Sequence, residues 1–430
     1  MTEPLNVAIA GLGTVGGGTL EVLLKNKELL ANRCGRPIEV RAIADPRKDL
    51  TFDVPVDGID WLDDALALVD RTDIDVVVEL IGGAHGIAKT LAEKALAAGR
   101  HVVTANKAMI AHHGIELAKA AESSGACLGY EAAVAGGIPI IKAMREGLAA
   151  NGISRVYGIL NGTCNYILTA MGETGRDFDS VLTEAQELGY AEADPSFDVD
   201  GVDTAHKLAI LTSLAFGVKL DFGAVHMEGI RHVSALDIAF AEQLGYRIKL
   251  LGIAQKTARG IEQRVHPCMV PADSGIAKVS GVFNAVVADA DFVDTTTYEG
   301  RGAGAHPTAS AVVADIVDIA RGNTLPTFTL PVAQLSPLEP APMAGHYGPY
   351  YVRLMVTDEP GVFADVAAVL RDNKISMESV LQQARAPGEP VPVVMTVHET
   401  EEAAMVAALM AIEAMPSVVE PPRMIRIEPL

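Results

Sequence analysis

Residues 5–24, LNVAIAGLGTVGGGTLEVLL, decide the fold of the first third of the chain. An apolar run predicts a strand, and the periodic apolar segment after the glycines predicts a helix. Gly11, Gly13 and Gly16 stand between them in the pattern G-x-G-x-x-G. Such glycines permit a tight turn, a close approach of pyrophosphate to the backbone and close packing of the helix. Free N–H groups at the helix start favour phosphate, so the stretch predicts a dinucleotide-binding loop.

The following segments alternate between the same two patterns. Residues 38–45, 73–83 and 101–104 are short apolar runs, and residues 86–98 have helical spacing. This alternation predicts a doubly wound parallel sheet, a Rossmann-type α/β domain. Lys107 lies just past the carboxyl end of a strand, where such sheets bind ligands. A lysine there is also common in a plain solvated loop.

The second strand carries two signals about the cofactor. It ends in Asp45, and Arg47 and Lys48 follow at once. An acid at this position binds the ribose hydroxyls of NAD, whereas a nearby arginine accommodates the 2′-phosphate of NADP. Both are present, and the two cations fit a solvated turn equally well. The choice between NAD and NADP therefore stays open.

The stretch EADPSFDVDGVDTAHK, residues 192–207, concentrates carboxylates ahead of a helix. An EF-hand alignment puts Lys207 where the bidentate glutamate belongs, which excludes a calcium loop. Neither His206 nor any cysteine offers zinc-ligand spacing. Asp203 and Lys207 are i and i+4 on one helix face. An apolar stripe opposite favours a surface ion pair worth roughly 0.3–0.5 kcal/mol; the alternative is a lysine proton donor held by an aspartate.

Composition excludes several classes of function. The chain has 430 residues, enough for two or three domains, and its formal net charge of −21 would repel nucleic acid. It contains neither a run of about 18 apolar residues nor an N-terminal secretion signal, so we expect no membrane partner. Separated cysteines without a CxxC pair predict free thiols in a reducing cytoplasm. They are Cys34, Cys127, Cys164 and Cys268.

Several stretches together resemble the homoserine dehydrogenase family, in its bacterial type with a C-terminal regulatory domain. They occur in the family's order over nearly the whole of residues 5–322, and the long central one is highly specific. They are GLGTVGGG, TANKA, EAAVAGGIPII, LNGTCNYIL, ELGYAEADPSFDVDGVDTAHKLAIL and GRGAGAHPTASAVVADI. One departure is GGAHG at 82–86, where the family leads us to expect a proline; it touches no catalytic position.

The resemblance implies reversible hydride transfer between a nicotinamide cofactor and the C4 aldehyde of L-aspartate 4-semialdehyde, giving L-homoserine. Lys207 matches the family's proton donor, and Asp203 the carboxylate that positions it. Lys107 matches a lysine near the nicotinamide and the substrate. A lysine whose pKa is lowered by burial suits proton transfer to an alkoxide. The positions that match the substrate pocket are Thr163, Asp198 and, at the substrate's amino end, Glu192.

The resemblance also implies a cofactor site and a cation site. The matching cofactor positions are Gly11, Gly13, Thr14, Val15, Gly16, Arg47, Thr104, Lys107 and Gly304. The family binds a monovalent cation, usually sodium, mainly through backbone carbonyls. The matching cation positions are Glu131, Val134, Gly136 and Ile138. An ordinary polar turn residue is the alternative for Glu131. The helix at 305–322 is expected to pack back against the nucleotide domain.

Residues 349–430 predict the order strand, helix, strand, strand, helix, strand, which is ferredoxin-like. With DEPGVFADV at its first turn, this part resembles an ACT domain, a module that binds amino acids. Asp358 and Gly361 would meet the charged ends of the ligand, and the family makes L-threonine the expected effector. The expected organisation is a nucleotide domain, an α+β catalytic and oligomerisation domain, a linker and the ACT domain, in a homodimer or homotetramer. The boundaries are 1–130, 131–304, 323–348 and 349–430.

Two other interpretations remain. An ACT-bearing dehydrogenase for 3-phosphoglycerate would need arginines grouped for a phosphate, and a histidine with an acid partner in the catalytic loop. The central segment offers Asp203 and Lys207 instead. A non-catalytic amino-acid sensor that merely keeps a nucleotide fold would not need Lys107, Asp203 and Lys207 together.

Overall fold

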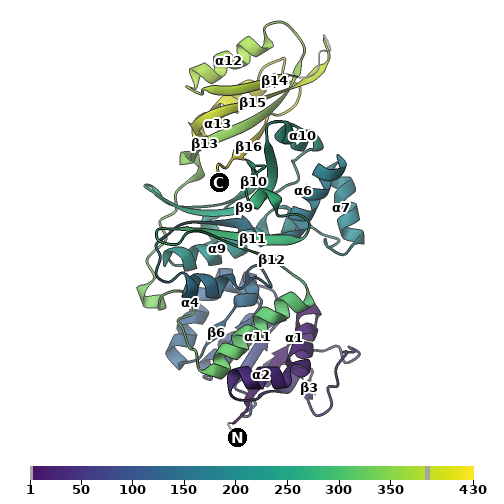
Figure 1. Cartoon of the computed structure of the whole chain (residues 1–430), viewed down its shortest axis with the longest axis vertical. Helices are drawn as coiled ribbons and strands as arrows, with labels where there is room; N and C mark the ends of the chain where they lie inside the picture. Colours follow the sequence, from purple (N-terminus) through teal and green to yellow (C-terminus); the bar gives the residue numbers. More distant parts are fainter. Residues whose placement is uncertain (1–2, 383–387) are drawn as a thin grey trace.

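The computed structural model describes residues 3–382 and 388–430. Its N-terminal part, at the bottom of Figure 1, contains a six-stranded sheet. Every pair of strands in it is parallel, and the order is β3-β2-β1-β4-β5-β6. This order reverses between β1 and β4, beside the glycine-rich turn, where such sheets bind dinucleotides. The predicted doubly wound sheet is confirmed. The strands are β1 Leu5–Ala10, β2 Ile38–Ala44, β3 Asp60–Leu62, β4 Val76–Glu79, β5 His101–Thr104 and β6 Leu128–Gly129.

Apolar side chains cover both faces of this sheet, as its near-continuous apolar strands require. One face packs against α1, α2 and α11, and the other against α3 and α4. Helix α11 follows the middle of the chain but lies along α1 (Figure 1), as the resemblance implies. A Cβ on Gly18 would lie 2.9 Å from the carbonyl oxygen of Ala305, so the contact needs glycine. The helices are α1 Thr14–Lys25, α2 Lys27–Cys34, α3 Ile87–Ala97, α4 Lys107–Ser124 and α11 Ala305–Arg321.

The middle part is built on antiparallel strands in the order β12-β11-β7-β9-β10. Helix α9 lies between this sheet and α4 of the nucleotide part, and almost all of its residues are buried. The strands are β7 Ile153–Ile159, β8 His226–Met227, β9 Tyr246–Thr257, β10 Gly260–Pro271, β11 Phe283–Ala290 and β12 Asp294–Arg301. The helices are α5 Ile140–Lys142, α6 Gly162–Thr174, α7 Phe178–Glu187, α8 Ser196–Val199, α9 Val202–Phe216 and α10 Ala235–Gln243.

The C-terminal part has the predicted βαββαβ order, with strands arranged β16-β13-β15-β14. It also continues the middle sheet, because β10 pairs with β16 in parallel at Cys268↔Arg426 and Met269↔Ile427. The two parts therefore share one 10-stranded sheet, a continuity that the sequence does not predict. The elements are β13 Tyr347–Thr357, α12 Val362–Asp372, β14 Met377–Gln382, β15 Pro390–Glu401, α13 Glu402–Glu413 and β16 Arg423–Ile427.

Residues 323–348, predicted as a linker, are packed along the other parts. Phe328 and Val332 are buried, and Ser336 and Pro340 form bridges with Val218 and Ile261. The exact domain boundaries stay a prediction. Within the described ranges, every helix is too short or too polar to cross a bilayer.

Candidate active site

The glycine-rich turn after β1 has the backbone that its sequence predicts. Gly11 has a φ of +87°, and a Cβ there would lie 2.6 Å from the carbonyl oxygen of Leu80. A Cβ on Gly16 would overlap the carbonyl oxygen of Gly11. Around Gly13 the space is open to 4 Å, and α1 begins directly afterwards at Thr14 and Val15. The turn is thus an open cradle against a helix N-terminus, which fits a pyrophosphate.

The two cofactor signals at the end of β2 form a single ion pair. Arg47 Nε and Nη2 donate to the two carboxylate oxygens of Asp45 at 2.9 and 2.8 Å, and Leu12 N donates to Asp45 Oδ2 at 2.8 Å. The guanidinium holds the pKa of Asp45 well below its usual range. Both residues line a cavity of about 370 Å³ with Gly11 and Gly13. The acid is neutralised by the cation beside it.

Thr104 does not offer its side chain to a cofactor. Its hydroxyl donates to Glu79 Oε2 at 2.6 Å and accepts from Asn106 N at 2.9 Å. Asn106 Nδ2 in turn donates to the carbonyl oxygen of Gly83 at 2.7 Å. These bonds tie the turn after β4 to the start of α4, and so fix the position of Lys107.

Asp203 lies between two lysines that come from different helices. Lys107 Nζ, at the start of α4, is 2.6 Å from Asp203 Oδ1, and Lys207 Nζ, one turn along α9, is 2.8 Å from Oδ2. Asp203 and Lys207 are buried, so the surface-pair interpretation is wrong. All three line a cavity of about 330 Å³. Its other lining residues are Asn161, Gly162, Thr163, Gly189, Tyr190, Asp198, Val282, Arg301, Gly302, Ala303 and Gly304.

The environment separates the proton affinities of the two lysines. Burial would raise the pKa of Asp203, but the ammonium groups of Lys207 and Lys107 outweigh it, so the pKa falls. Burial lowers the pKa of Lys207, and Asp203 offsets this only in part. Burial also disfavours the charged form of Lys107, but the attraction of the Asp203 carboxylate is larger, so the pKa of Lys107 rises. Lys207 therefore holds its proton less firmly than an ordinary lysine, and Lys107 holds it more firmly.

Asn161 is a site residue that the sequence reasoning missed. Its Nδ2 donates to Asp198 Oδ1 and to Asp203 Oδ2, both at 2.7 Å, while its Oδ1 caps α6 by accepting from Cys164 N at 2.8 Å. The amide therefore holds the two carboxylates together. Burial and the charge of Asp203 raise the pKa of Asp198. An Asn before Gly-Thr at a helix start is the available signal, and it indicates a cap.

The remaining predicted substrate residues differ in their placement. Thr163 lines the cavity, and its hydroxyl donates to the carbonyl oxygen of Tyr190 at 2.7 Å. Glu192 is exposed and is not part of the cavity wall, although its charge contributes to the raised pKa of Lys107. Gly304, expected near the cofactor, lines the same cavity.

The predicted cation positions lie in a buried turn ahead of α5. Ala135 and Gly136 have φ values of +55° and +50°, which bend the backbone sharply. Ile138 N donates to Ala135 O at 3.0 Å, but within the described ranges no donor contacts the carbonyl oxygens of Val134 and Gly136. Buried carbonyls normally have a partner. A cation that takes oxygen ligands fits this turn.

The side chain of Glu131 has a different task in the same turn. Its two carboxylate oxygens accept from Ile141 N and Lys142 N, each at 2.9 Å. The carboxylate thus satisfies the first N–H groups of α5, and burial raises its pKa to about 7. Only further lone pairs of the carboxylate, or the backbone carbonyl, are left for a cation.

The two predicted effector residues lie together in the C-terminal part. Asp358 and Gly361 line a cavity of about 90 Å³ between β13 and the start of α12. Gly361 has a φ of +101° and precedes the first residue of α12, so the helix N-terminus faces this turn. Backbone N–H groups and a carboxylate are the groups that an amino acid needs at its two ends.

A dinucleotide cradle, together with a cavity that holds two lysines and an aspartate, defines an NAD(P)-dependent oxidoreductase. The chain is 46% identical over 434 residues to a homoserine dehydrogenase of Neisseria gonorrhoeae, a match that covers 100% of this chain and 99% of that protein. The chain belongs to the homoserine dehydrogenase family.

Family models and solved structures agree with this membership. The homoserine dehydrogenase NAD binding domain matches residues 11–131, homoserine dehydrogenase residues 139–317, and the ACT domain residues 350–416. A homoserine dehydrogenase structure from Thiobacillus denitrificans has a TM-score of 0.94 at 45% identity and covers 99% of both chains. A hyperthermophilic archaeal homoserine dehydrogenase in complex with NADPH has a TM-score of 0.63 at 27% identity, covering 74% of this chain and 97% of that chain.

Proposed function

We propose that the chain interconverts L-homoserine and L-aspartate 4-semialdehyde with NAD(P). The observation that carries this proposal is Asp203, buried between the ammonium groups of Lys107 and Lys207 at the wall of one cavity. Oxidation of an alcohol requires a group that takes the hydroxyl proton and a positive charge near the developing alkoxide. This trio supplies both.

Lys207 is the proton-transfer group. Its Nζ donates to the carbonyl oxygen of Leu160 at 2.6 Å and to Asp203 at 2.8 Å. Because an ammonium has three donors, one position on Nζ remains for the substrate oxygen. In homoserine oxidation neutral Lys207 takes the proton of the C4 hydroxyl as the carbonyl bond forms. In the reverse direction the ammonium returns that proton to the alkoxide.

Lys107 keeps its charge during this exchange and stabilises negative charge on the same oxygen. When bound, the nicotinamide ring supplies the acceptor or donor of the hydride at C4 of the substrate. Asp203 holds the two ammonium groups apart and oriented, since each of its oxygens faces one of them. Asp203 is therefore a positioning group for both lysines.

The substrate's amino-acid end requires a carboxylate for its ammonium group. Asp198 and Thr163 line the cavity and are proposed to contact this end. The proposed partner of the ammonium group is Glu192, whose exposed side chain is free to turn toward a bound substrate. A Glu192→Gln variant is expected to raise KM for homoserine and leave KM for the cofactor unchanged.

NADP is the proposed preferred cofactor. Arg47 neutralises Asp45, and 56% of the Arg47 side chain is exposed, so its guanidinium can also bind a 2′-phosphate. The archaeal relative solved with NADPH supports this proposal. The proposed monovalent cation, sodium, is supported by the buried carbonyls of Val134 and Gly136. It would hold this turn rather than take part in hydride transfer.

L-Threonine is the proposed feedback effector, bound at Asp358 and Gly361, and the assembly is proposed to be a homodimer or homotetramer in the cytoplasm. The ACT match at residues 350–416 supports an amino-acid effector. Isothermal titration with L-threonine tests the site, with L-serine, which lacks one methyl group, as the matched ligand. Light scattering tests the assembly.

One absorbance assay tests the reaction itself. Formation of NADPH from NADP, or of NADH from NAD, is followed with L-homoserine and with 3-phosphoglycerate. The proposal requires turnover with homoserine alone among the two substrates. Turnover with 3-phosphoglycerate would favour the other dehydrogenase class, and no turnover with either would favour an amino-acid sensor.

A further inference from the structure

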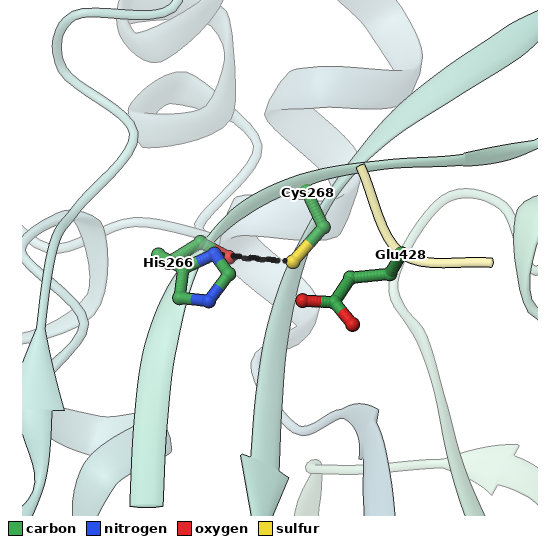
Figure 2. Close-up of side chains that lie close together, drawn as sticks. All are labelled: His266, Cys268 and Glu428. Carbon is green, nitrogen blue, oxygen red and sulfur yellow. Dashed lines mark hydrogen bonds between the residues drawn. The ribbon is translucent and has the colours of Figure 1, made fainter. Parts of the chain in front are cut away.

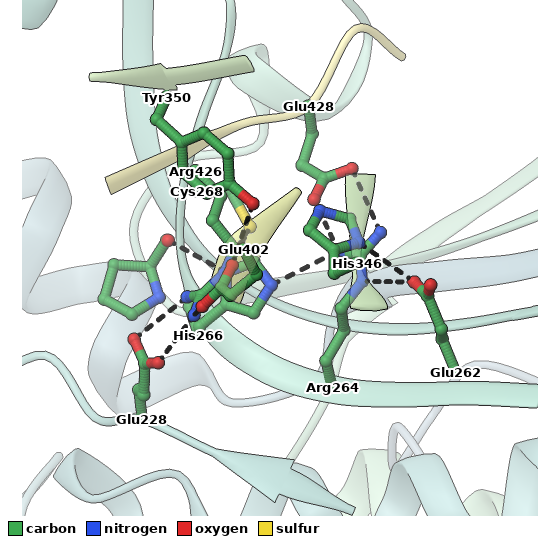
Figure 3. Close-up of polar contacts among 11 residues, drawn as sticks. Glu228, Glu262, Arg264, His266, Cys268, His346, Tyr350, Glu402, Arg426 and Glu428 are labelled. Carbon is green, nitrogen blue, oxygen red and sulfur yellow. Dashed lines mark hydrogen bonds and ion pairs between the residues drawn. The ribbon is translucent and has the colours of Figure 1, made fainter. Parts of the chain in front are cut away.

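Two buried arginines organise the junction between the middle and C-terminal parts (Figure 3). Arg264 on β10 pairs with Glu428 and with Glu262, the latter at 3.3 Å. Arg426 on β16 pairs with carboxylates from both parts. We call this set the junction network. Its members are Glu228, Glu262, Arg264, His266, Cys268, His346, Tyr350, Glu402, Arg426 and Glu428.

Three members, His266, Cys268 and Glu428, have the geometry of metal ligands, with donor atoms within 4.8 Å of one another (Figure 2). Arg264 Nη1, however, lies 3.2 Å from His266 Nε2, and a guanidinium only donates. Nε2 therefore accepts, which leaves the ring proton on Nδ1, where it is donated to the carbonyl oxygen of Pro267 at 3.0 Å. Neither nitrogen then offers a lone pair to a metal. Arg264 also holds the Glu428 carboxylate. The trio belongs to a network of ion pairs rather than to a metal site.

Arg426 bridges the two parts with its whole guanidinium. Nη1 and Nη2 donate to Glu228 Oε2 and Oε1 at 3.0 and 2.8 Å. Nε donates to Glu402 Oε2 at 3.0 Å, and Nη2 also donates to Oε1. Tyr350 donates its hydroxyl to the same glutamate at 2.9 Å. Glu228 is thus held in a bidentate fork, the most orienting geometry for an arginine and a carboxylate.

The segment that follows Glu228 contacts the active-site helix α8 directly. Ile230 N donates to the carbonyl oxygen of Val199 at 2.8 Å. Arg231 forms a fork with Asp200 at 2.5 and 3.1 Å. The backbone at Gly229 packs directly against the residue that follows α8, because a Cβ on Gly229 would lie 2.6 Å from Asp200 Cα. A displacement of residue 228 is therefore passed to α8.

Helix α8 carries Asp198 into the substrate cavity, where Asn161 joins it to Asp203. We propose that Arg426 is a positioning residue for the active site: its fork on Glu228 fixes segment 228–231, and through it α8 and Asp198. The C-terminal part then serves the catalytic cavity even when no effector is bound. The kinetic half of this inference rests on the proposed homoserine dehydrogenase reaction, but its structural half does not.

Hydrogen exchange of the full chain, followed by mass spectrometry, tests the structural half. Glu228→Gln keeps the shape of the side chain and removes its charge, and Glu228 is partly exposed, so the variant should fold. We expect about tenfold faster exchange for amides in 196–201, which corresponds to about 1.4 kcal/mol of lost local stability. Arg426→Lys keeps the charge but loses the fork and should give an intermediate rate.

Arg353→Gln is the matched control. Arg353 on β13 forks onto Asp237 of α10 at 2.7 and 3.3 Å, so its loss also breaks a buried pair across the junction, but at α10 and not at segment 228–231. It should leave exchange in 196–201 unchanged. Equal loosening by Arg353→Gln, or no change in Glu228→Gln, would overturn the proposal.

Kinetics then separate positioning from general damage. Glu228→Gln should raise KM for L-homoserine about three- to tenfold, with KM for NADP unchanged and kcat changed less. An unchanged KM for homoserine, or an equal rise in both KM values, would overturn the proposal. If the wild-type chain oxidises no homoserine, the proposed reaction fails, whereas the exchange rates still decide whether Arg426 positions α8.

Discussion

Two buried charges in this molecule are each held between two groups of the opposite sign. Asp203 lies between Lys107 and Lys207 at the active-site cavity, and Arg426 lies between Glu228 and Glu402 at the junction. Each central residue is 2% exposed. The two trios are mirror images in charge, but they differ in what the outer groups can do.

At the cavity, burial leaves one outer group with a weakened hold on its proton, because the pKa of Lys207 is lowered. At the junction the outer group Glu228 holds its charge more firmly. Burial would raise the pKa of Glu228, but hydrogen bonds from His226 and Arg426 outweigh it and lower the pKa. A buried charge trio beside a cavity therefore prepares a proton transfer, whereas a closed one fixes geometry.

Removing Lys207 should have the largest effect. Lys207→Ala takes away the proposed proton-transfer group, and such a group typically contributes about 10²–10⁴-fold to the rate. We expect kcat for homoserine oxidation to fall by that factor, with NADPH affinity unchanged. Lys219→Ala, an exposed lysine just beyond the same helix, is the control and should be near wild type. A fully active Lys207→Ala variant would make the cavity trio structural, like the junction trio.

Neutralising Asp203, the central charge of the cavity trio, should lower the rate less and should shift the pH profile in a definite direction. Asp203 raises the pKa of Lys207, so Asp203→Asn should lower it further. Homoserine oxidation needs neutral Lys207, and the acid limb of the kcat/KM profile should therefore move to lower pH. We also expect kcat to fall about 10²-fold, because the lysines lose their shared partner. A limb that moves to higher pH would contradict this coupling.

The Asp45–Arg47 pair, in which only the arginine is exposed, extends the comparison to the cofactor cavity. Arg47→Ala should raise KM for NADP about tenfold or more, since a charged hydrogen bond contributes about 1.5–3 kcal/mol. KM for NAD should stay unchanged or fall, because Asp45 becomes free for a ribose hydroxyl. Lys48, in the same turn, pairs with Asp63 instead. The Lys48→Ala variant should therefore change both KM values little. Equal effects on both cofactors would exclude 2′-phosphate recognition by Arg47.

The smallest effect is expected on stability at the junction. The pKa of Glu228 is lowered from 4.5 in the folded chain, so its contribution is present above that value and is lost as the pH falls. The side chain is 41% exposed, and solvent screening limits the contribution to about 1 kcal/mol. Urea unfolding should show Glu228→Gln less stable than wild type at about pH 7, with the difference shrinking towards about pH 3. A difference that does not vary with pH would point to lost packing instead.

Local patterns predicted much of the fold and half of the site. Gly11 and Gly16 mark the cradle because only glycine fits their backbone and contacts. Asp203 and Lys207 are visible as a pair because helical spacing is a local property. The burial of that pair could not be predicted, because it depends on how α4 and the middle sheet pack around α9.

Other features depend on chain segments that meet only in space. The reach of Lys107 to Asp203 joins residues almost a hundred positions apart, and the fork of Arg426 on Glu228 spans 198 positions. The sequence around Asn161 indicates only a helix cap, and nothing in it indicates the hydrogen bond from the Asn161 amide to Asp198. Backbone carbonyls at Val134 and Gly136 leave no trace in side-chain identity, so only the family resemblance could indicate them.

The pairing of β10 with β16 also bears on how this chain could be shortened. A chain cut at residue 348 would lose Arg426 and Glu428. The edge of β10 would then be unpaired at Cys268 and Met269, beyond its pairing with β8, and Arg264 would keep only Glu262 as a counter-ion. An uncovered strand edge is a template for aggregation, and the loss of one partner from a buried ion pair is strongly destabilising. For this sequence the ACT domain is therefore not a detachable accessory: variants that lack the proposed effector response should be sought by point substitution, not by deletion.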